Sequence, residues 1–476
     1  MKIFHATAEF FPYIKMGGLS DMLSSLSKQQ SETHEVSVAL PLIRNLKVEP
    51  NFTGNTFSAI HPNSILGAES SFILRDSIFR EAKFGNVTLY FFDSPLFNSL
   101  DKIYENPDEH YRFALFSYAC FHLSLSKEVD IVHCHDWHTA LTTYFHSSST
   151  IGLPTIFTIH NLAYQGDHPE YLCGFLKGEP FYLNLDILKH DGKINYLKGA
   201  VSVSKRITTV SPGYRDEVLW EPNGCGLSYN LRQRGKDFLG ILNGIDSQEW
   251  NPASDKNLDH NFDLLTVSQG KIKNKTSLYK EIKRDINPSR PLIGLIGRLT
   301  WQKGYRTFLE SFKNKTRLPF FYVFLGSGDP ELENELFYHS HHSLDRLFFY
   351  KGYSESFARK IEASSDFFLM PSLFEPCGLN QLYSHAYGSI PIVSRVGGLK
   401  DTVIEDPYDL SMNTGLLFEP GDHHSLDYAL ERANTLYNNS QQLIDIRSRI
   451  MKLDWSWSNR FKEYTNVYKS MLEEKS

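Results

Sequence analysis

Two short segments of the chain combine positively charged side chains with glycine. Lys15 is followed by Gly17 and Gly18, and Arg298 is followed five residues later by Lys303, with a glycine on either side of that segment. Glycine lets backbone amides approach an anion, and a helix N-terminus adds partial positive charge. Both segments therefore favour phosphate binding. The alternative for the first segment is a tight turn with a solvated lysine, and the alternative for the second is a pair of surface cations.

The common phosphate and metal motifs are absent from the 476 residues. There is no GxxxxGK[ST] segment of a P-loop and no GxGxxG segment of a dinucleotide-binding domain. There is also no Asp-x-Asp pair, which is a common way to hold a divalent ion against a sugar-nucleotide diphosphate. A protein of this sequence that handles a diphosphate must instead use Lys, Arg and helix N-termini.

Four side chains of types that bind metals lie close together in the sequence. They are His133, Cys134, His135 and His138. In a strand, His133 and His135 share one face and Cys134 points to the other. This spacing does not give a closed tetrahedral set of zinc ligands, and we predict no metal site.

A further polar segment follows the apolar residues 367–370. It contains Glu375, Cys377 and Gly378, and a helix is expected to begin near Leu379. Glu375 either caps this helix or contacts a polar substrate. Cys377 has no neighbouring base that would activate it, which favours a packing or substrate-lining thiol over a nucleophile.

Length and composition exclude several classes of protein. At about 150 residues per domain, the chain is long enough for two or three domains. A formal charge of −6 disfavours a nucleic-acid partner, and no apolar run reaches the roughly 18 residues of a membrane helix. The N-terminus lacks a secretory pattern, and the five cysteines are scattered without a CxxC pair. We expect a cytoplasmic protein that binds neither nucleic acid nor membrane.

The elements that must position these side chains alternate between strands and helices. Apolar runs predict strands at residues 2–7, 36–40, 87–92, 131–134, 155–158, 291–297, 320–325, 347–350, 367–370 and 390–393. Helical spacing follows Gly18 and recurs over 111–125. This alternation is typical of parallel strands joined by right-handed crossovers. It predicts an α/β fold of two doubly wound domains facing a cleft, with a polar linker at 243–274.

Seven motifs of the chain resemble, in order, those of bacterial glycogen synthases and plant starch synthases. They are KMGGL at 15–19, HDWH at 135–138, HNLAYQG at 160–166, NGID at 243–246, RLTWQKG at 298–304, EPCGL at 375–379 and GGLKDT at 397–402. The resemblance extends from residue 1 to about 460. Met16 stands where the family commonly has threonine, and Tyr383 stands where the wider superfamily has a second glutamate.

The resemblance implies a glycosyltransferase-B fold, in which two Rossmann-like domains face a cleft. The N-terminal domain is then expected at 1–243, on the side of the glucan acceptor. The C-terminal domain is expected at 244–456 and binds ADP-glucose. A last helix, at about 457–476, is expected to pack back on the first domain.

The implied activity is transfer of glucose from ADP-glucose to the non-reducing end of glycogen or a malto-oligosaccharide, with retention and without metal or cofactor. Retention leaves two routes open. In one, the leaving phosphate takes the proton of the acceptor on the same face of the sugar; in the other, a protein nucleophile intervenes. A UDP-glucose transferase and an inactive glucan-binding relative are the alternative functions.

The resemblance also assigns roles to single residues. Arg298 and Lys303 are expected at the diphosphate, and His160 and Glu375 around the glucose, as the catalytic set. Tyr353 is expected to stack on adenine. The implied substrate contacts are Lys15, Gly17, Gly18, Asp21, Asp136, Asn161, Asn243, Tyr353, Cys377, Gly378 and Leu379.

Overall fold

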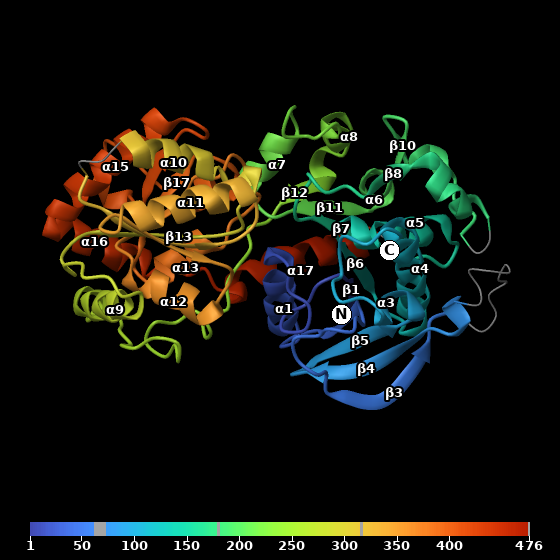
Figure 1. Ribbon diagram of the computed structural model, residues 1–476. Coiled ribbons are helices and arrows are strands. Elements are labelled where there is room, and N and C mark those ends of the chain that lie inside the picture. The colour runs from blue at the N-terminus through green and yellow to red at the C-terminus, as the bar shows by residue number, and fades with distance from the viewer. Residues whose placement is uncertain (61–72, 179–180, 315–317, 475–476) are drawn as a thin grey trace. The chain divides into compact units, whose positions relative to one another are not determined.

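The computed structural model describes residues 1–60, 73–178, 181–314 and 318–474, which form two compact units (Figure 1). The first unit comprises Met1–Gly244 together with Trp457–Ser476, and the second comprises Ile245–Ser456. Each unit is built on its own sheet, with helices packed against it. Among the described residues, no helix has the length and apolar character needed to cross a membrane.

The first unit has a nine-stranded sheet. Its strands, in order across the sheet, are β12 (Phe238–Gly240), β11 (Arg206–Thr209), β7 (Thr155–Ile159), β6 (Ile131–His135), β1 (Lys2–Ala6), β2 (Glu35–Pro41), β5 (Val87–Asp93), β4 (Ile78–Phe84) and β3 (Phe52–Ser58). From β12 to β5 all neighbours pair in parallel. β4 and β3 are added antiparallel at one edge. The sequence did not predict this pair, because β3 is mostly exposed and carries no apolar run.

The helices of the first unit cover this sheet. They are α1 (Gly18–Gln30), α3 (Pro95–Asn98), α4 (Glu109–Ser126), α5 (Ala140–Ser148), α6 (Tyr196–Val203), α7 (Pro212–Val218), α8 (Ser228–Gln233) and α17 (Trp457–Glu473). A small antiparallel sheet is formed by β8 (Asp167–Pro169), β10 (Lys193–Asn195) and β9 (Lys189–His190). Helix α1 buries Leu19, Met22, Leu23 and Leu26, which recur at the spacing of one helix face.

The C-terminal helix α17 belongs to the first unit and contacts α1. Its buried residues include Tyr464 and Tyr468, whose rings are fully enclosed. Trp455 precedes this helix and lies in the second unit. The indole nitrogen of Trp455 donates to Nδ1 of His385 at 3.1 Å.

The second unit has a six-stranded sheet in which every neighbouring pair is parallel. Its strands, in order, are β15 (Leu347–Lys351), β14 (Phe321–Gly326), β13 (Leu292–Ile296), β16 (Phe367–Met370), β17 (Ile390–Ser394) and β18 (Leu416–Phe418). Its helices are α9 (Val267–Glu281), α10 (Tyr305–Asn314), α11 (Pro330–His342), α12 (Glu355–Ser364), α13 (Asn380–Ala386), α14 (Gly397–Thr402), α15 (His423–Asn438) and α16 (Ser440–Ile450). The five strands predicted for this half are all present.

The prediction of a polar linker over 243–274 is wrong for most of that segment. Residues from Ile245 onward are part of the second unit, and α9 begins inside the segment. Leu258 and Phe262 are buried, and the Trp250 ring stacks on Tyr383 with centroids 3.4 Å apart. The polar composition hid these apolar residues, because they are too widely spaced to give a helix or strand period.

A buried group of charges fixes the position of β16. Asp366, directly before this strand, accepts from Lys275 of α9 at 2.5 Å and from Arg447 of α16 at 2.7 Å. It also accepts from the backbone amide of Leu292 at the start of β13. Removing one partner from such a buried network is costly because it leaves an unpaired charge. Asp366 thereby holds β13 and β16 side by side.

The strand order reverses at one point in each unit. In the first unit the chain leaves β1 toward β2 on one side and later returns to β6 on the other, and in the second unit β13 stands between β14 and β16 in the same way. Open α/β sheets bind ligands outside the carboxyl ends of their strands at such switch points. The loops after β1, β6, β13 and β16 are therefore the places to look for a site.

Candidate active site

Three of the predicted site residues of the first unit follow the carboxyl ends of three neighbouring strands, whereas Asn243 follows the edge strand β12. Lys15 lies in the loop after β1, Asp136 directly follows β6, and His160 directly follows β7. Parallel strands bring these loops to one edge of the sheet. Lys15, Asp136 and His160 thus lie at the edge of the sheet that contains its switch point.

The loop after β1 is organised by Glu9. Its Oε2 accepts from the backbone amides of Met16 at 2.7 Å and Gly17 at 2.9 Å, and Tyr104 donates its hydroxyl to Oε1 at 2.7 Å. The Gly17 amide, expected beside a phosphate, is therefore bound to a carboxylate of the chain itself. Sequence reasoning missed Glu9, although an acidic residue just after the first strand was a signal that pointed to this edge.

Lys15 forms an ion pair with Asp21 in the first turn of α1. Its Nζ lies 3.0 Å from Oδ1 of Asp21, and both side chains are partly exposed. A pair that solvent reaches in this way contributes little to stability. The pair holds the cation close to the N-terminus of α1.

Asp136 connects β6 with the loop after β7. It has a positive φ of 56°, which is uncommon for a residue other than glycine, and its Oδ1 accepts from the amide of His160 at 2.8 Å. Burial, with a smaller contribution from the negative charge of Glu9, raises the pKa of Asp136 to about 7. Its carboxyl group therefore titrates near neutral pH and holds the backbone of His160 in place.

His160 and Asn243 differ in how their polar atoms are satisfied. Burial lowers the pKa of His160 to about 3, so its imidazole is neutral at physiological pH, and Nε2 lies 3.1 Å from Nδ1 of His135. The side-chain oxygen of Asn243 is buried without a hydrogen-bond partner among the described residues. Such an oxygen is costly unless a ligand or water satisfies it. Asn161 uses its Oδ1 to accept from the amide of Ala163.

In the second unit, Lys303 is paired with Glu375. Nζ of Lys303 lies 2.6 Å from Oε2 of Glu375, and Ser372 donates its hydroxyl to the same oxygen at 2.9 Å. Glu375 is buried, whereas Lys303 is partly exposed. The interpretation of Glu375 as a helix cap is wrong, because Leu379 is the N-cap of α13 and no side chain caps that helix. The carboxylate of Glu375 binds the ammonium group of Lys303 instead of capping the helix.

Glycines allow the two loops that carry this pair to touch. Gly304 ends the short 3-10 helix η5 (Trp301–Lys303) at a φ of 63°, and a Cβ there would lie 1.9 Å from the carbonyl oxygen of Pro371. The amide of Leu373 donates to the carbonyl of Gln302 at 2.8 Å. A side chain at Gly304 would push the loop after β13 away from the loop after β16 and separate the ion pair.

The segment from Glu375 to Leu379 lies against the start of α14. A Cβ at Gly397 would be 2.0 Å from the carbonyl oxygen of Glu375, and one at Gly398 would be 2.3 Å from that of Cys377. Gly378 has a φ of 74°, and a Cβ there would meet Gln381 at 2.4 Å. The backbone of this segment is therefore fixed by glycine contacts, with Cys377 buried and Gly378 partly exposed.

Two further predicted residues lie at the same edge of the second sheet. Arg298 follows β13 and is exposed, and its side chain makes no hydrogen bond or ion pair within the described part of the chain. Tyr353 follows β15, is also exposed, and donates its hydroxyl to Glu355. Both side chains are accessible to a ligand from solvent.

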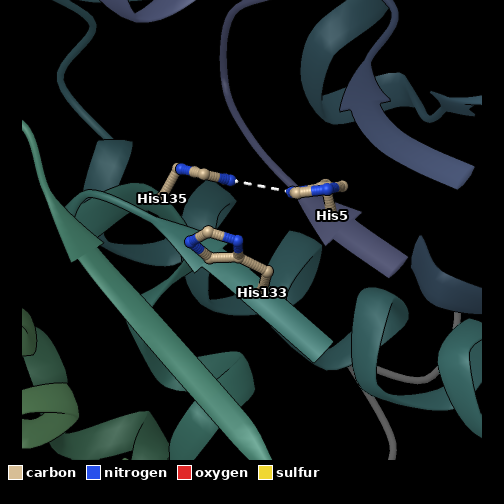
Figure 2. A group of neighbouring side chains, drawn as sticks. All are labelled: His5, His133 and His135. Atoms are coloured by element: carbon tan, nitrogen blue, oxygen red, sulfur yellow. Dashed lines mark hydrogen bonds between the residues drawn. The ribbon is translucent and has the colours of Figure 1, made fainter. Parts of the chain in front are cut away.

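Three buried histidines form a cluster beneath the loops of the first unit. Figure 2 shows His5, His133 and His135, whose possible ligand atoms all lie within 4.8 Å of one another. His133 and His135 share a face of β6, as predicted, but the third member is His5, which pairs in register with His133. His138, which the sequence also suggested, packs instead between Tyr104 and Phe113.

Comparison with known proteins places this architecture in a known class. The family described as "Starch synthase catalytic domain" matches residues 2–233, and that described as "Glycosyl transferases group 1" matches residues 280–447. The glycogen synthase of Leptospira biflexa is 56% identical over 99% of both chains. That of Exiguobacterium sibiricum is 36% identical over 98% of this chain and 99% of its own.

Solved structures agree with the sequence comparison. The catalytic domain of Starch Synthase IV from Arabidopsis thaliana, bound to ADP and acarbose, has a TM-score of 0.88 and 30% identity over 99% of both chains. Sucrose-phosphate synthase from Thermosynechococcus elongatus shares the fold, with a TM-score of 0.63 and 15% identity. Two Rossmann-like units with these neighbours define a glycosyltransferase of the glycosyltransferase-B fold. The chain belongs to the glycogen synthase and starch synthase family.

The raised pKa of Asp136 gives a test of its environment. In the folded state the carboxyl group binds its proton up to about pH 7, whereas in the unfolded chain it loses the proton near 3.8. Folding stability contributed by the neutral form is therefore lost as pH rises through 7. We expect Asp136→Asn to gain stability relative to the parent between pH 5 and pH 8, by one to a few kcal/mol at about 1.4 kcal/mol per pKa unit.

Urea unfolding at both pH values measures this change. Asp216→Asn is the matched control, because Asp216 is exposed on α7 and its pairing partner is the adjacent Arg215. An equal stability difference between Asp136→Asn and the parent at pH 5 and pH 8 would show that burial does not hold this proton.

Proposed function

We propose that the chain transfers glucose from ADP-glucose to the non-reducing end of an α-1,4-glucan, with retention of configuration, in cytoplasmic glycogen biosynthesis. The observation that carries the proposal is the Lys303–Glu375 ion pair beside Arg298 at the carboxyl edge of the second sheet. The identity with glycogen synthases over nearly the whole chain supports the same activity. In this proposal the second unit binds ADP-glucose and the first unit binds the glucan.

The cations of the site act on the leaving group. Negative charge grows on the diphosphate as the bond to C1 of glucose breaks, and fixed positive charges stabilise it most where water is excluded. Arg298 and Lys303 are assigned to this role. Lys15 is assigned to the same diphosphate, with the Gly17–Gly18 loop beside it, once the phosphate displaces Asp21.

Polar groups of the first unit are assigned to the sugar. His160 is assigned to the glucose ring, as is Glu375 of the second unit, and Asp136, Asn161 and Asn243 are assigned to hydroxyl groups. The buried, unsatisfied oxygen of Asn243 supports this assignment, since a sugar hydroxyl would satisfy it. Tyr353 stacks on adenine, and Cys377, Gly378 and Leu379 line the donor. The reaction in this proposal needs neither metal ion nor cofactor.

Transfer on one face of the sugar fits the charges of the site. The bond between C1 and the diphosphate oxygen breaks, the bond between C1 and the acceptor O4 forms, and the acceptor proton goes to the leaving phosphate. Glu375 accepts from both Lys303 and Ser372, so it is poorly suited to attack C1 as a nucleophile. We therefore favour this route over a covalent intermediate.

The donor and the metal requirement are tested together. The purified protein is given glycogen primer with ADP-glucose or UDP-glucose, in excess EDTA. We expect elongation in EDTA, because side-chain cations neutralise the diphosphate. We expect kcat/KM to be higher for ADP-glucose, because the 30% identical starch synthase structure was solved with ADP bound. Complete loss of activity in EDTA that magnesium or manganese restores would contradict the proposal, as would a preference for UDP-glucose.

The role of Arg298 is tested by a matched pair of variants. We expect Arg298→Ala to lower kcat by about 100- to 1000-fold, the usual effect of removing one stabiliser of developing charge. Arg306→Ala is the control, because Arg306 is exposed on α10 and pairs with Glu331 at 2.9 Å. Its kcat should equal that of the parent. A normal kcat with a raised KM in Arg298→Ala would mean that Arg298 only binds the ground state.

A further inference from the structure

A continuous chain of hydrogen bonds runs from helix α1 to His160. The Gln30 side chain lies 2.9 Å from Nε2 of His5, and Nδ1 of His5 lies 3.0 Å from Nε2 of His135. Nδ1 of His135 then lies 3.1 Å from Nε2 of His160. The first three side chains are fully buried, and only His160 at the end of the chain is partly exposed.

The Gln30 side chain determines which nitrogen of each imidazole donates along this chain of hydrogen bonds. Its amide nitrogen donates to the hydroxyl of Tyr468 on α17 at 3.1 Å, so its oxygen faces His5 and accepts from Nε2 of that ring. A neutral imidazole carries one proton, and His5 must then accept at Nδ1 from Nε2 of His135. The same reasoning makes His135 accept at Nδ1 from Nε2 of His160.

Each imidazole of the chain is held in its neutral form. Burial lowers the pKa of His5 to about 4 and that of His160 to about 3, and it lowers the pKa of His135 well below its usual value. The polar groups that face these histidines are the other imidazole rings of the cluster and the side chain of Gln30. Gln30 in turn bonds to the hydroxyl of Tyr468. A chain of neutral rings transmits the choice of tautomer from one ring to the next.

The cluster is better described as a hydrogen-bonded chain than as a metal site. His133 bonds to the hydroxyl of Tyr468 through Nδ1 at 2.8 Å and to the hydroxyl of Thr158 through Nε2 at 2.6 Å. Both nitrogens of His5 and of His135 are also occupied. An ion would have to displace these bonds, since a neutral ring binds metal only through a free lone pair.

We propose that Gln30, His5 and His135 are positioning residues that fix His160 as the Nε2-protonated tautomer and leave the lone pair of Nδ1 available at the sheet edge. Nδ1 of His160 then accepts a hydrogen bond from a hydroxyl group of the bound sugar. This sugar contact rests on the proposed function. The tautomer itself is a property of the free protein and can be measured without substrate.

The tautomer is read by NMR. The full-length protein is labelled with nitrogen-15 in its histidine rings, and long-range proton–nitrogen spectra are recorded near neutral pH, where protonated and unprotonated ring nitrogens resonate far apart. His160→Asn and His5→Asn variants assign the signals. We expect His160, His135 and His5 all to carry the proton on Nε2. A proton on Nδ1 of His160 in the parent protein overturns the proposal.

The Gln30→Met variant tests whether Gln30 determines which ring nitrogen of each histidine carries the proton. Without the acceptor at Gln30, a proton on Nε2 of His5 would be a buried, unpaired donor. Reversal of the chain removes that donor, and we expect the Nδ1 signal of His160 to move to the protonated position. Gln30→Glu, which still accepts from His5, should keep the parent tautomer at His160.

Gln29→Met is the control. Gln29 precedes Gln30 on the same helix and bonds at the surface to Glu32, so the His160 signals should not move. An unchanged His160 tautomer in a folded Gln30→Met protein would overturn the role of Gln30. If the histidines show the expected tautomers but the protein does not use ADP-glucose, the proposal for the hydrogen-bonded chain stands and the proposed function is refuted.

Discussion

The ion pair between Lys303 and Glu375 is the contact on which the site of the second unit depends. It joins the loop after β13 to the loop after β16, at the point where the strand order reverses. Gly304 permits the close approach of the two loops, and Gly397 permits that of the Glu375 backbone to the start of α14. Asp366 bonds to the first residue of β13 and directly precedes β16, and so holds the amino-terminal ends of the two strands together. The ion pair between Lys303 and Glu375 can therefore form only when the sheet, the two loops and the glycines are all correctly placed.

The first unit positions its residues by a different means. Glu9 holds the loop of Lys15 through backbone amides, Asp136 holds the backbone of His160, and a chain of neutral imidazoles lies beneath them. Glu9, Gln30, His5 and His135 are buried, so their polar atoms need partners within the protein and the network has few alternative arrangements. Helix α17 of the first unit takes part through the hydroxyl of Tyr468, which accepts from Gln30.

The sequence predicted ten strands of the two large sheets and the charged residues in the loops that follow them, because apolar runs and glycine–cation segments are local signals. It missed the strands β3, β4, β12 and β18 at the sheet edges and the short strand β11. It did not predict the contacts between distant segments. Lys303 and Glu375 are 72 residues apart, and His5 and His135 are 130 residues apart, so only the order of the strands brings them together. Residues 245–266 were misjudged for a related reason, since their apolar side chains are buried by tertiary contacts that leave no period in the sequence.

The central claim is that Lys303 and Glu375 act as one unit during glucosyl transfer. A double-mutant cycle measures this directly: kcat at saturating ADP-glucose and glycogen is compared for the parent, Lys303→Met, Glu375→Gln and the double variant. We expect the double variant to be no slower than the slower single variant, with a coupling of about 1–3 kcal/mol. Losses that multiply in the double variant, with no coupling, would contradict it.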